Sequence, residues 1–288
     1  MEGFRLYLKH RKRSIATLKL YAKYAQAFEK WLSMEGLEVD AVIYTDMLAY
    51  IDSLRQKGLA VKSINGQLRA IGQYYDFLKS SNEVPSNPAS NLVLKGHTRS
   101  VVHQLLSERQ LEAIYASYQP ETLSQYRNKL MLSLIIYQGL VLRELEKLEI
   151  SHLKKESIEV PATSGSNGRI LALQPEQSDQ IEKYLGEIRP KILAESGEVT
   201  EQLLLTLQGS KRLKNPLALM IKQLRRKHPS LNNASQLRQS RIRIWLEKYD
   251  LRTVQYMAGH RYISSTERYA FQDIRDLQAA LSKFHPLG

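Results

Sequence analysis

The sequence predicts a mainly helical protein with two parts: an all-helical N-terminal domain and a larger C-terminal α+β domain that contains one small β-hairpin. Three observations predict this fold class. Apolar residues recur at spacings of three and four through most of the chain, as on the buried face of a helix. The segment EVPSNPASN interrupts that pattern, and two short apolar stretches flank a Gly/Ser/Asn turn only once, in ESIEVPATSGSNGRILALQ. A chain of 288 residues is long enough for two cores.

The N-terminal domain is expected to span residues 1–83. After a basic cluster, Ser14 is a suitable N-cap for a helix that stops at Gly36. Its apolar stripe, from Ile15 to Trp31 or Leu32, predicts one buried face. The same periodicity predicts further helices at about 45–56 and 62–78.

A linker is expected between the two domains, at residues 84–104. Pro85 and Pro88 cannot continue a helix and favour extended or turn backbone. Basic residues in this stretch, Lys95 and Arg99 among them, suggest that it lies along a negatively charged partner.

The C-terminal domain is expected to span residues 105–288. Ser107 is the predicted N-cap of its first helix, and Gly139 the predicted end of a longer apolar one. The further elements, in order, are a helix from about 123 to 137, a short helix after it, the β-hairpin, a helix at about 175–193, a short strand at 203–207, a helix at about 216–227, the final helices, and an amphipathic tail at 273–284.

The composition points to nucleic acid as a partner. A formal net charge of +13 is more than solubility requires, and so basic a surface attracts polyanions. The absence of cysteine excludes disulfides, thiolate metal sites and cysteine nucleophiles, and fits a reducing compartment. The N-terminus lacks the apolar core of a signal peptide, and the longest apolar run is too short for a bilayer. We therefore expect a cytoplasmic protein without membrane association.

The chemically most informative stretch is residues 237–269, which ends in AGHRYISSTERY. It places Arg238 on one helix, a Gly-His pair at 259–260, and Tyr269 nine residues after His260. This pattern resembles the catalytic C-terminus of the tyrosine recombinases, the phage-integrase and Xer-like enzymes. The resemblance extends over nearly the whole chain and implies a helical core-binding (SAM-like) domain followed by a mixed catalytic domain.

The resemblance implies a site-specific DNA recombinase that acts through a 3′-phosphotyrosine intermediate, for a mobile element, without metal or other cofactor. Tyr269 would be the nucleophile, and Arg238 and His260 would bind the scissile phosphate. A tyrosine hydroxyl has a pKa of about 10 and needs neighbouring cations to become a nucleophile. Arg238, His260 and Arg268 are the available neighbours in the sequence. The alternative for Tyr269 is a tyrosine that only packs a helix end.

Three positions depart from the family pattern. Val141 stands at the position of the first family arginine, Ser164 at that of the transition-state lysine, and Ser235 at that of a histidine. In other phosphoryl-transfer systems a missing arginine costs on the order of 10³ to 10⁵ in rate. The cations or donors considered as compensation are Arg143, Ser235, Arg169 and Arg261. Because Arg143 lies two residues from Val141, it would share that face only on an irregular helix.

These departures leave three functions open. The first is a site-specific recombinase, and the second is a DNA-binding architectural or regulatory protein on the same fold that does not cut. The third is a relaxing, topoisomerase-like activity. A helper recombinase or accessory DNA-bending protein also remains open as a partner.

Double-stranded DNA is the expected partner, held mainly through its phosphates by a clamp of basic residues. The alternative is that these residues are merely solvated faces. The candidates are Lys9, Arg11, Lys12, Arg13, Lys62, Arg69, Lys95, Arg99, Lys211, Arg212 and Arg241. The tail would dock on a neighbouring protomer, so the resemblance implies a dimer or tetramer on DNA. The other reading of the tail is a helix packed on its own domain.

Overall fold

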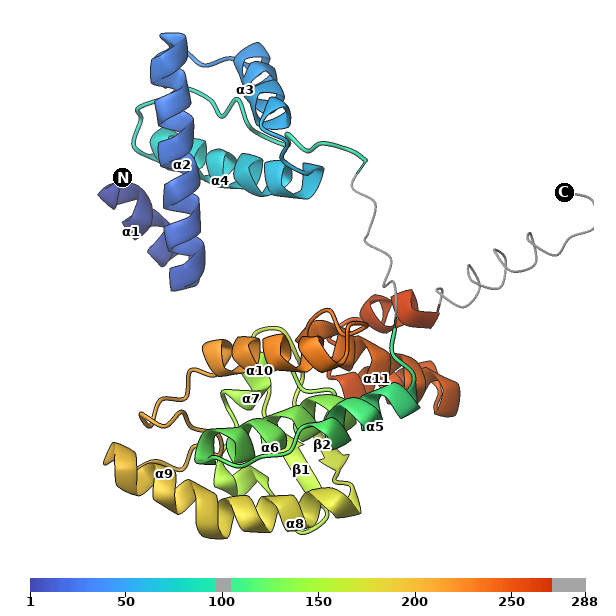
Figure 1. The fold of residues 1–288 in the computed structure, drawn as a ribbon. Coiled ribbons are helices and arrows are strands. Elements are labelled where there is room, and N and C mark those ends of the chain that lie inside the picture. The colour runs from blue at the N-terminus through green and yellow to red at the C-terminus, as the bar shows by residue number, and fades with distance from the viewer. Residues whose placement is uncertain (97–104, 271–288) are drawn as a thin grey trace, which may run out of the picture. The chain divides into compact units, whose positions relative to one another are not determined.

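The computed structural model describes residues 1–96 and 105–270, which form two compact units divided near residue 100 (Figure 1). The fold is mainly helical with one small antiparallel sheet, as the sequence predicts. Arg99 and the expected tail helix at 273–284 lie outside the described residues.

The N-terminal unit consists of helices only, as far as it is described. They are α1 (Glu2–His10), α2 (Ile15–Glu35), α3 (Tyr44–Gln56) and α4 (Val61–Ser80). As predicted, the Ser14 hydroxyl caps α2 by accepting from the Thr17 N–H at 3.2 Å, and Gly36 ends the helix in the left-handed conformation. Helix α1 was not predicted. It forms because Phe4 and Leu8, one turn apart, are fully buried in the core.

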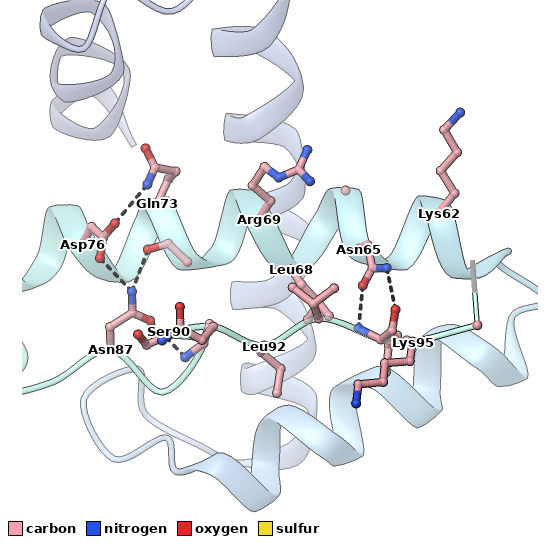
Figure 2. A pocket seen from close by; sticks show the side chains of 17 residues that line it. Lys62, Asn65, Leu68, Arg69, Gln73, Asp76, Asn87, Ser90, Leu92 and Lys95 are labelled. Carbon is pink, nitrogen blue, oxygen red and sulfur yellow. Dashed lines mark hydrogen bonds between the residues drawn. The ribbon is translucent and has the colours of Figure 1, made fainter. Parts of the chain in front are cut away.

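The first part of the predicted linker packs onto the N-terminal unit. Residues 84–96 run along α4, and the Asn65 side chain bonds both the N–H and the carbonyl of Leu94 at 2.9 and 3.0 Å (Figure 2). Asn87 donates to Asp76 and to the Gly72 carbonyl, while Val84 and Ala89 enter the core. These contacts satisfy polar groups of a segment of turns and irregular backbone that belongs to no helix or sheet.

The C-terminal unit places a small sheet among helices. Its elements are α5 (Glu108–Ser117), α6 (Leu123–Gln138), α7 (Leu142–Leu145), the 3₁₀ turn η1 (Ile150–His152), β1 (Ser157–Val160), β2 (Arg169–Ala172), α8 (Pro175–Lys183), the π-helical η2 (Tyr184–Ile188), α9 (Arg189–Ser196), α10 (Lys214–Lys227), α11 (Ala234–Lys248) and α12 (Leu251–Ala258). Residues 264–270 are helical as well.

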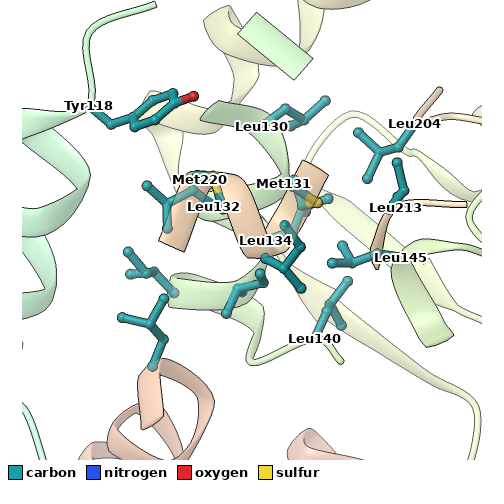
Figure 3. Packing of buried hydrophobic residues seen from close by; sticks show 14 of the residues in the cluster. Tyr118, Leu130, Met131, Leu132, Leu134, Leu140, Leu145, Leu204, Leu213 and Met220 are labelled. Carbon is teal, nitrogen blue, oxygen red and sulfur yellow. The ribbon is translucent and has the colours of Figure 1, made fainter. Parts of the chain in front are cut away.

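Helix α6 is the centre of this unit's core. It packs against α5, α8, α10 and α11, and its leucines lie among Met220 of α10 and Leu204 and Leu213 of the loop between α9 and α10 (Figure 3). Burial all round α6 fits the uninterrupted apolar run from which the sequence predicts it. The helix ends at Gly139, which is in the left-handed conformation.

The β-hairpin pairs Ser157 with Ala172 and Val160 with Arg169. Side chains alternate between the two faces of a strand, so Arg169 points to the same buried side as Leu171. An arginine therefore faces inward at the end of β2, and its charge requires a partner.

Two predicted elements differ from the structure. The strand expected at 203–207 does not form, because side chains rather than a neighbouring strand bind its carbonyls: Tyr184 donates to Leu203, and Arg127 donates to Leu205. The helix expected at 175–193 continues to Ser196 but contains the π-helical turn η2, which interrupts its regular hydrogen bonding.

Candidate active site

Arg238 projects from the second turn of α11 and joins the ends of two other helices. Its guanidinium donates to the carbonyl of Gly139, which follows α6, and to that of Ala258, the last residue of α12, at 2.6 Å in the second case. The side chain is 11% exposed. Burial lowers the pKa of Arg238 to about 10, so it stays positively charged at neutral pH.

Glu144 of α7 forms a buried ion pair with Arg169 of β2. Two hydrogen bonds of 2.7 and 3.1 Å join the carboxylate to the guanidinium, and neither side chain is exposed. Burial by itself would raise the pKa of Glu144, but the bonds and charge of Arg169 outweigh it and keep the pKa below its usual range. Arg238 lies 4.0 Å from the same carboxylate. Glu144 thus fixes both arginines, in keeping with a structural acid.

The Gly-His pair follows α12 directly. Gly259 has a φ of +66°, and a Cβ there would lie 2.4 Å from Nη1 of Arg169, so only glycine fits. Next to it, His260 Nδ1 lies 2.8 Å from Oγ1 of Thr266. Burial, then the charges of Arg238 and Arg268, lower the pKa of His260 to about 4. The imidazole is therefore neutral at physiological pH.

Tyr269 lies in the helical segment 264–270 and is 2% exposed. It packs in a small apolar cluster that includes Trp245 and Ala258. Its ring is nearly parallel to that of His260, with centroids 6.3 Å apart, and its hydroxyl accepts a hydrogen bond of 2.6 Å from Arg268 Nη2. The structure thus brings Arg238, His260 and Tyr269 together, the three residues predicted to act on the phosphate.

The three positions that depart from the family pattern have separate surroundings. Val141 precedes α7, where its backbone N–H donates to Glu144 at 2.9 Å. Ser164 is exposed in the hairpin turn and accepts a hydrogen bond of 3.1 Å from Arg143. Ser235 is exposed on the first turn of α11, three residues before Arg238 and on the same face.

The candidates for compensation divide into exposed and buried residues. Arg143 and Arg261 are exposed and both bind the hairpin turn: Arg143 donates to the Ser164 hydroxyl, and Arg261 donates to the Thr163 carbonyl at 3.0 Å. Arg169 is a correction to the sequence-based set. Its guanidinium is fully buried and bound by Glu144 and by the Met257 carbonyl, so it cannot contact DNA without breaking that core.

The predicted DNA-binding residues are mostly exposed. Lys9, Arg11, Lys12, Arg13, Lys211 and Arg212 all lie at the surface. Three others, Lys62, Arg69 and Lys95, are exposed along one open groove of about 990 Å³ between α4 and residues 87–96 (Figure 2). Their shared position could not be predicted from the sequence, because Lys95 lies some thirty residues beyond Lys62.

Arg241 is a second correction. It is 7% exposed, donates to the Ile136 carbonyl at 2.7 Å and pairs with Glu108 at 3.2 Å. It therefore fastens α11 to α5 and α6 instead of facing DNA. The sequence could not predict that Arg241 is buried, because only the packing of α11 decides which arginines of that helix point inward.

Within residues 1–96 and 105–270, no three His, Asp or Glu side chains lie together as a metal would require. In the same ranges, no helix is long and apolar enough to cross a bilayer.

Two family models match the chain. The model described as the phage integrase family matches residues 104–274, and that described as the phage integrase N-terminal SAM-like domain matches residues 1–82. The second match covers the four helices of the N-terminal unit, and the first covers Arg238, His260 and Tyr269.

Individual proteins are similar to this one over nearly the full chain. The tyrosine recombinase XerC of Staphylococcus saprophyticus is 23% identical over 279 residues, which cover 94% of this chain and 91% of XerC. Among solved structures, XerH site-specific recombinase bound to palindromic difH substrate has a TM-score of 0.76 at 18% identity, covering 96% of this chain and 82% of that one. The Tn1549 transposon integrase in complex with transposon right end DNA has a TM-score of 0.65 at 17% identity, with 98% of both chains covered.

Proposed function

This chain belongs to the phage integrase family of tyrosine recombinases, and on that premise we propose that it breaks and rejoins DNA at specific sites through Tyr269. The observation that carries the proposal is the cluster around Tyr269. A phenol, an imidazole and a guanidinium from three separate segments lie together in one positively charged site.

Cleavage would begin when the Tyr269 oxygen attacks a backbone phosphorus. The bond from phosphorus to the 5′ oxygen breaks, which leaves a 3′-phosphotyrosine and a 5′ hydroxyl. The phenol loses one proton and the 5′ oxygen gains one, so the step needs no redox partner and no nucleotide. Rejoining is the same exchange in reverse, with a 5′ hydroxyl attacking the phosphotyrosine.

Arg238 would stabilise the charge that develops on the phosphate. It is positive at neutral pH, and its forked donors suit two phosphate oxygens. Its hydrogen bonds to the Gly139 and Ala258 carbonyls hold it in place before DNA arrives, which avoids reorganisation during the reaction.

His260 would act as a neutral hydrogen-bond donor. With a pKa of about 4 it carries no charge at neutral pH. When Thr266 donates to Nδ1, the proton of the ring lies on Nε2, which can then donate to a phosphate oxygen.

Tyr269 must become accessible before it can attack, because only 2% of it is exposed. DNA binding would therefore be accompanied by a shift of segment 264–270. The cost includes removing the Tyr269 ring from its contacts with Trp245 and Ala258.

The proposal is tested by trapping the covalent intermediate. A duplex site is first selected from a random-sequence pool by binding to the full chain, and is then nicked close to the cleavage position so that the released fragment is lost. We expect a protein–DNA adduct that survives denaturation and disappears in Tyr269→Phe. Equal adduct yield from Tyr269→Phe would place the nucleophile elsewhere.

A second candidate is a DNA-binding protein on this fold that does not cut. It is favoured by Val141, Ser164 and Ser235 at three positions where the family has catalytic residues, and by the burial of Tyr269. Tight binding to the selected site without adduct, across a range of nick positions, would support it. Relaxation of supercoiled DNA of arbitrary sequence would instead favour a topoisomerase-like activity.

The biological setting that we propose is the movement of a mobile element, carried out by a dimer or tetramer on DNA, with any helper recombinase or DNA-bending protein supplied separately. The similarity to a transposon integrase supports this setting. Analytical ultracentrifugation of the full chain with the selected duplex tests the assembly. A single protomer per duplex at saturation would contradict it.

A further inference from the structure

We propose that Arg268 is a catalytic residue that binds the Tyr269 oxygen as it changes from phenol to phenolate. This inference rests on the proposed function, because it assigns a role within the same cleavage step. Arg268 belongs to neither the matching nor the departing family positions. The sequence identifies it only as a cation next to Tyr269, and the structure shows that its guanidinium contacts the Tyr269 hydroxyl.

The contact between Arg268 and the reacting atom is direct. Nη2 donates to the Tyr269 hydroxyl at 2.6 Å, and the guanidinium carbon lies 4.7 Å from the centroid of the tyrosine ring. A charge-assisted hydrogen bond to an oxygen strengthens as that oxygen becomes negative. The interaction therefore stabilises the attacking phenolate more than the resting phenol, as catalysis requires.

Arg268 is exposed next to the buried nucleophile, so DNA that reaches Tyr269 would also be within reach of its guanidinium. Its side chain is exposed, whereas Tyr269 beside it is buried. A guanidinium has five N–H donors, of which the contact with Tyr269 uses one. Arg268 can thus hold the nucleophile and a non-bridging phosphate oxygen at once, which would bring the two reacting groups together.

Other arginines near the site have different contacts. Arg169 is sealed in its ion pair with Glu144, and Arg238 holds the ends of α6 and α12. Arg143 and Arg261 bond the hairpin turn at Ser164 and Thr163. Among the described residues, the hydrogen bond that reaches the Tyr269 hydroxyl comes from Arg268.

The opposite role for Arg268 is a latch that holds Tyr269 in its buried position. Both roles use the same hydrogen bond, but they predict opposite effects when the arginine is removed. A latch would slow the reaction, so its loss would speed adduct formation. A catalytic cation would accelerate the reaction, so its loss would slow adduct formation.

The experiment measures the rate of adduct formation by the full chain on the selected, nicked duplex, at saturating DNA. The variants are Arg268→Gln, Arg268→Lys and the control Arg252→Gln, which removes an exposed arginine of α12 whose side chain bonds Gln255. We expect Arg268→Gln to lower the rate roughly 10²- to 10³-fold, as loss of one preorganised donor does elsewhere. Arg268→Lys should recover part of the rate, and Arg252→Gln should retain it.

A second substrate distinguishes whether Arg268→Gln slows attack by the nucleophile or departure of the leaving group. In this duplex, sulfur replaces the bridging 5′ oxygen at the cleavage position, so that the leaving group departs without gaining a proton. If Arg268 acts on the nucleophile, Arg268→Gln remains as defective on this substrate as on the normal one. Recovery of the rate would place Arg268 on the leaving group and overturn the assignment.

Different results would contradict DNA cleavage through Tyr269 and the role of Arg268 in it. No adduct from the unchanged protein overturns the proposed cleavage and the role of Arg268 with it. An adduct from the unchanged protein, formed equally fast or faster by Arg268→Gln, overturns the role of Arg268 alone. Binding of the selected duplex by Arg268→Gln within about threefold of the unchanged protein would show that the loss lies in the chemical step.

Discussion

Six arginines of the C-terminal unit divide into a buried group and an exposed group. Arg169, Arg238 and Arg241 are mostly enclosed, and each is bound by carbonyl oxygens and by a glutamate close by. Arg143, Arg261 and Arg268 are exposed, and they donate hydrogen bonds to a serine hydroxyl, a backbone carbonyl and the tyrosine hydroxyl, respectively. One residue type thus serves two purposes. Buried guanidinium groups hold the helices of the site together, and exposed ones are available to phosphates. Arg238, whose side chain is 11% exposed, holds two helix ends and in the proposed mechanism also binds the phosphate.

Breaking the buried group should have the largest effect. Glu144→Ala leaves Arg169 charged and unpaired in the core, which we expect to lower the free energy of unfolding by about 3–5 kcal/mol. The free energy of unfolding is measured by guanidinium denaturation, followed by the fluorescence of Trp245. Trp31→Phe is introduced into every variant so that Trp245 is the sole tryptophan. The exposed Glu159→Gln serves as the control. A loss below 1 kcal/mol would mean that Arg169 finds another partner.

Gly259→Ala tests how closely the buried group is packed. The new Cβ would lie 2.4 Å from Arg169 in a left-handed conformation, so we expect a loss of roughly 2–3 kcal/mol. Gly197→Ala has a similar φ of +68° with no atom within 4 Å of the added carbon, and it measures the backbone strain alone. Equal losses in the two variants would show that the contact with Arg169 contributes nothing.

The neutral state of His260 predicts a pH dependence. Its folded pKa of about 4 is below its ordinary value of about 6.5, so the unfolded chain takes up the proton first as the pH falls. Because of His260, the free energy of unfolding should therefore fall by roughly 2 kcal/mol as the pH drops from 6.5 to 4, after allowance for its partial exposure. His260→Gln should flatten the profile over that interval. An unchanged slope would rule out the lowered pKa.

Changes in the exposed group should leave stability almost unaffected and alter DNA binding instead. Arg143→Gln should shift the free energy of unfolding by less than about 0.5 kcal/mol. If Arg143 contacts one phosphate, the slope of log affinity against log salt should become shallower by about 0.9. Titrations of the selected duplex at several salt concentrations measure this slope. A slope equal to that of the unchanged chain would mean that Arg143 only holds Ser164.

Much of the fold could be predicted from the chain because its signals are local. Ser14, Gly36 and Gly139 mark helix ends through hydrogen bonds and backbone conformations that depend on a few adjacent residues. The hairpin was predictable for the same reason. The absent strand at 203–207 was not, because its carbonyls are bound by Tyr184 and Arg127, which are distant in sequence.

For the site, the sequence by itself determined which chemical groups are present: Tyr269, His260 and Arg238 at family spacing, with Val141, Ser164 and Ser235 at three other positions. Only the tertiary structure decided what each arginine touches. The contacts of Arg169 with Glu144 and of Arg143 with Ser164 join separate segments, and Arg268 meets the hydroxyl of its own neighbour. Burial and charge pairing depend on how helices and hairpin pack, and no local pattern contains that information.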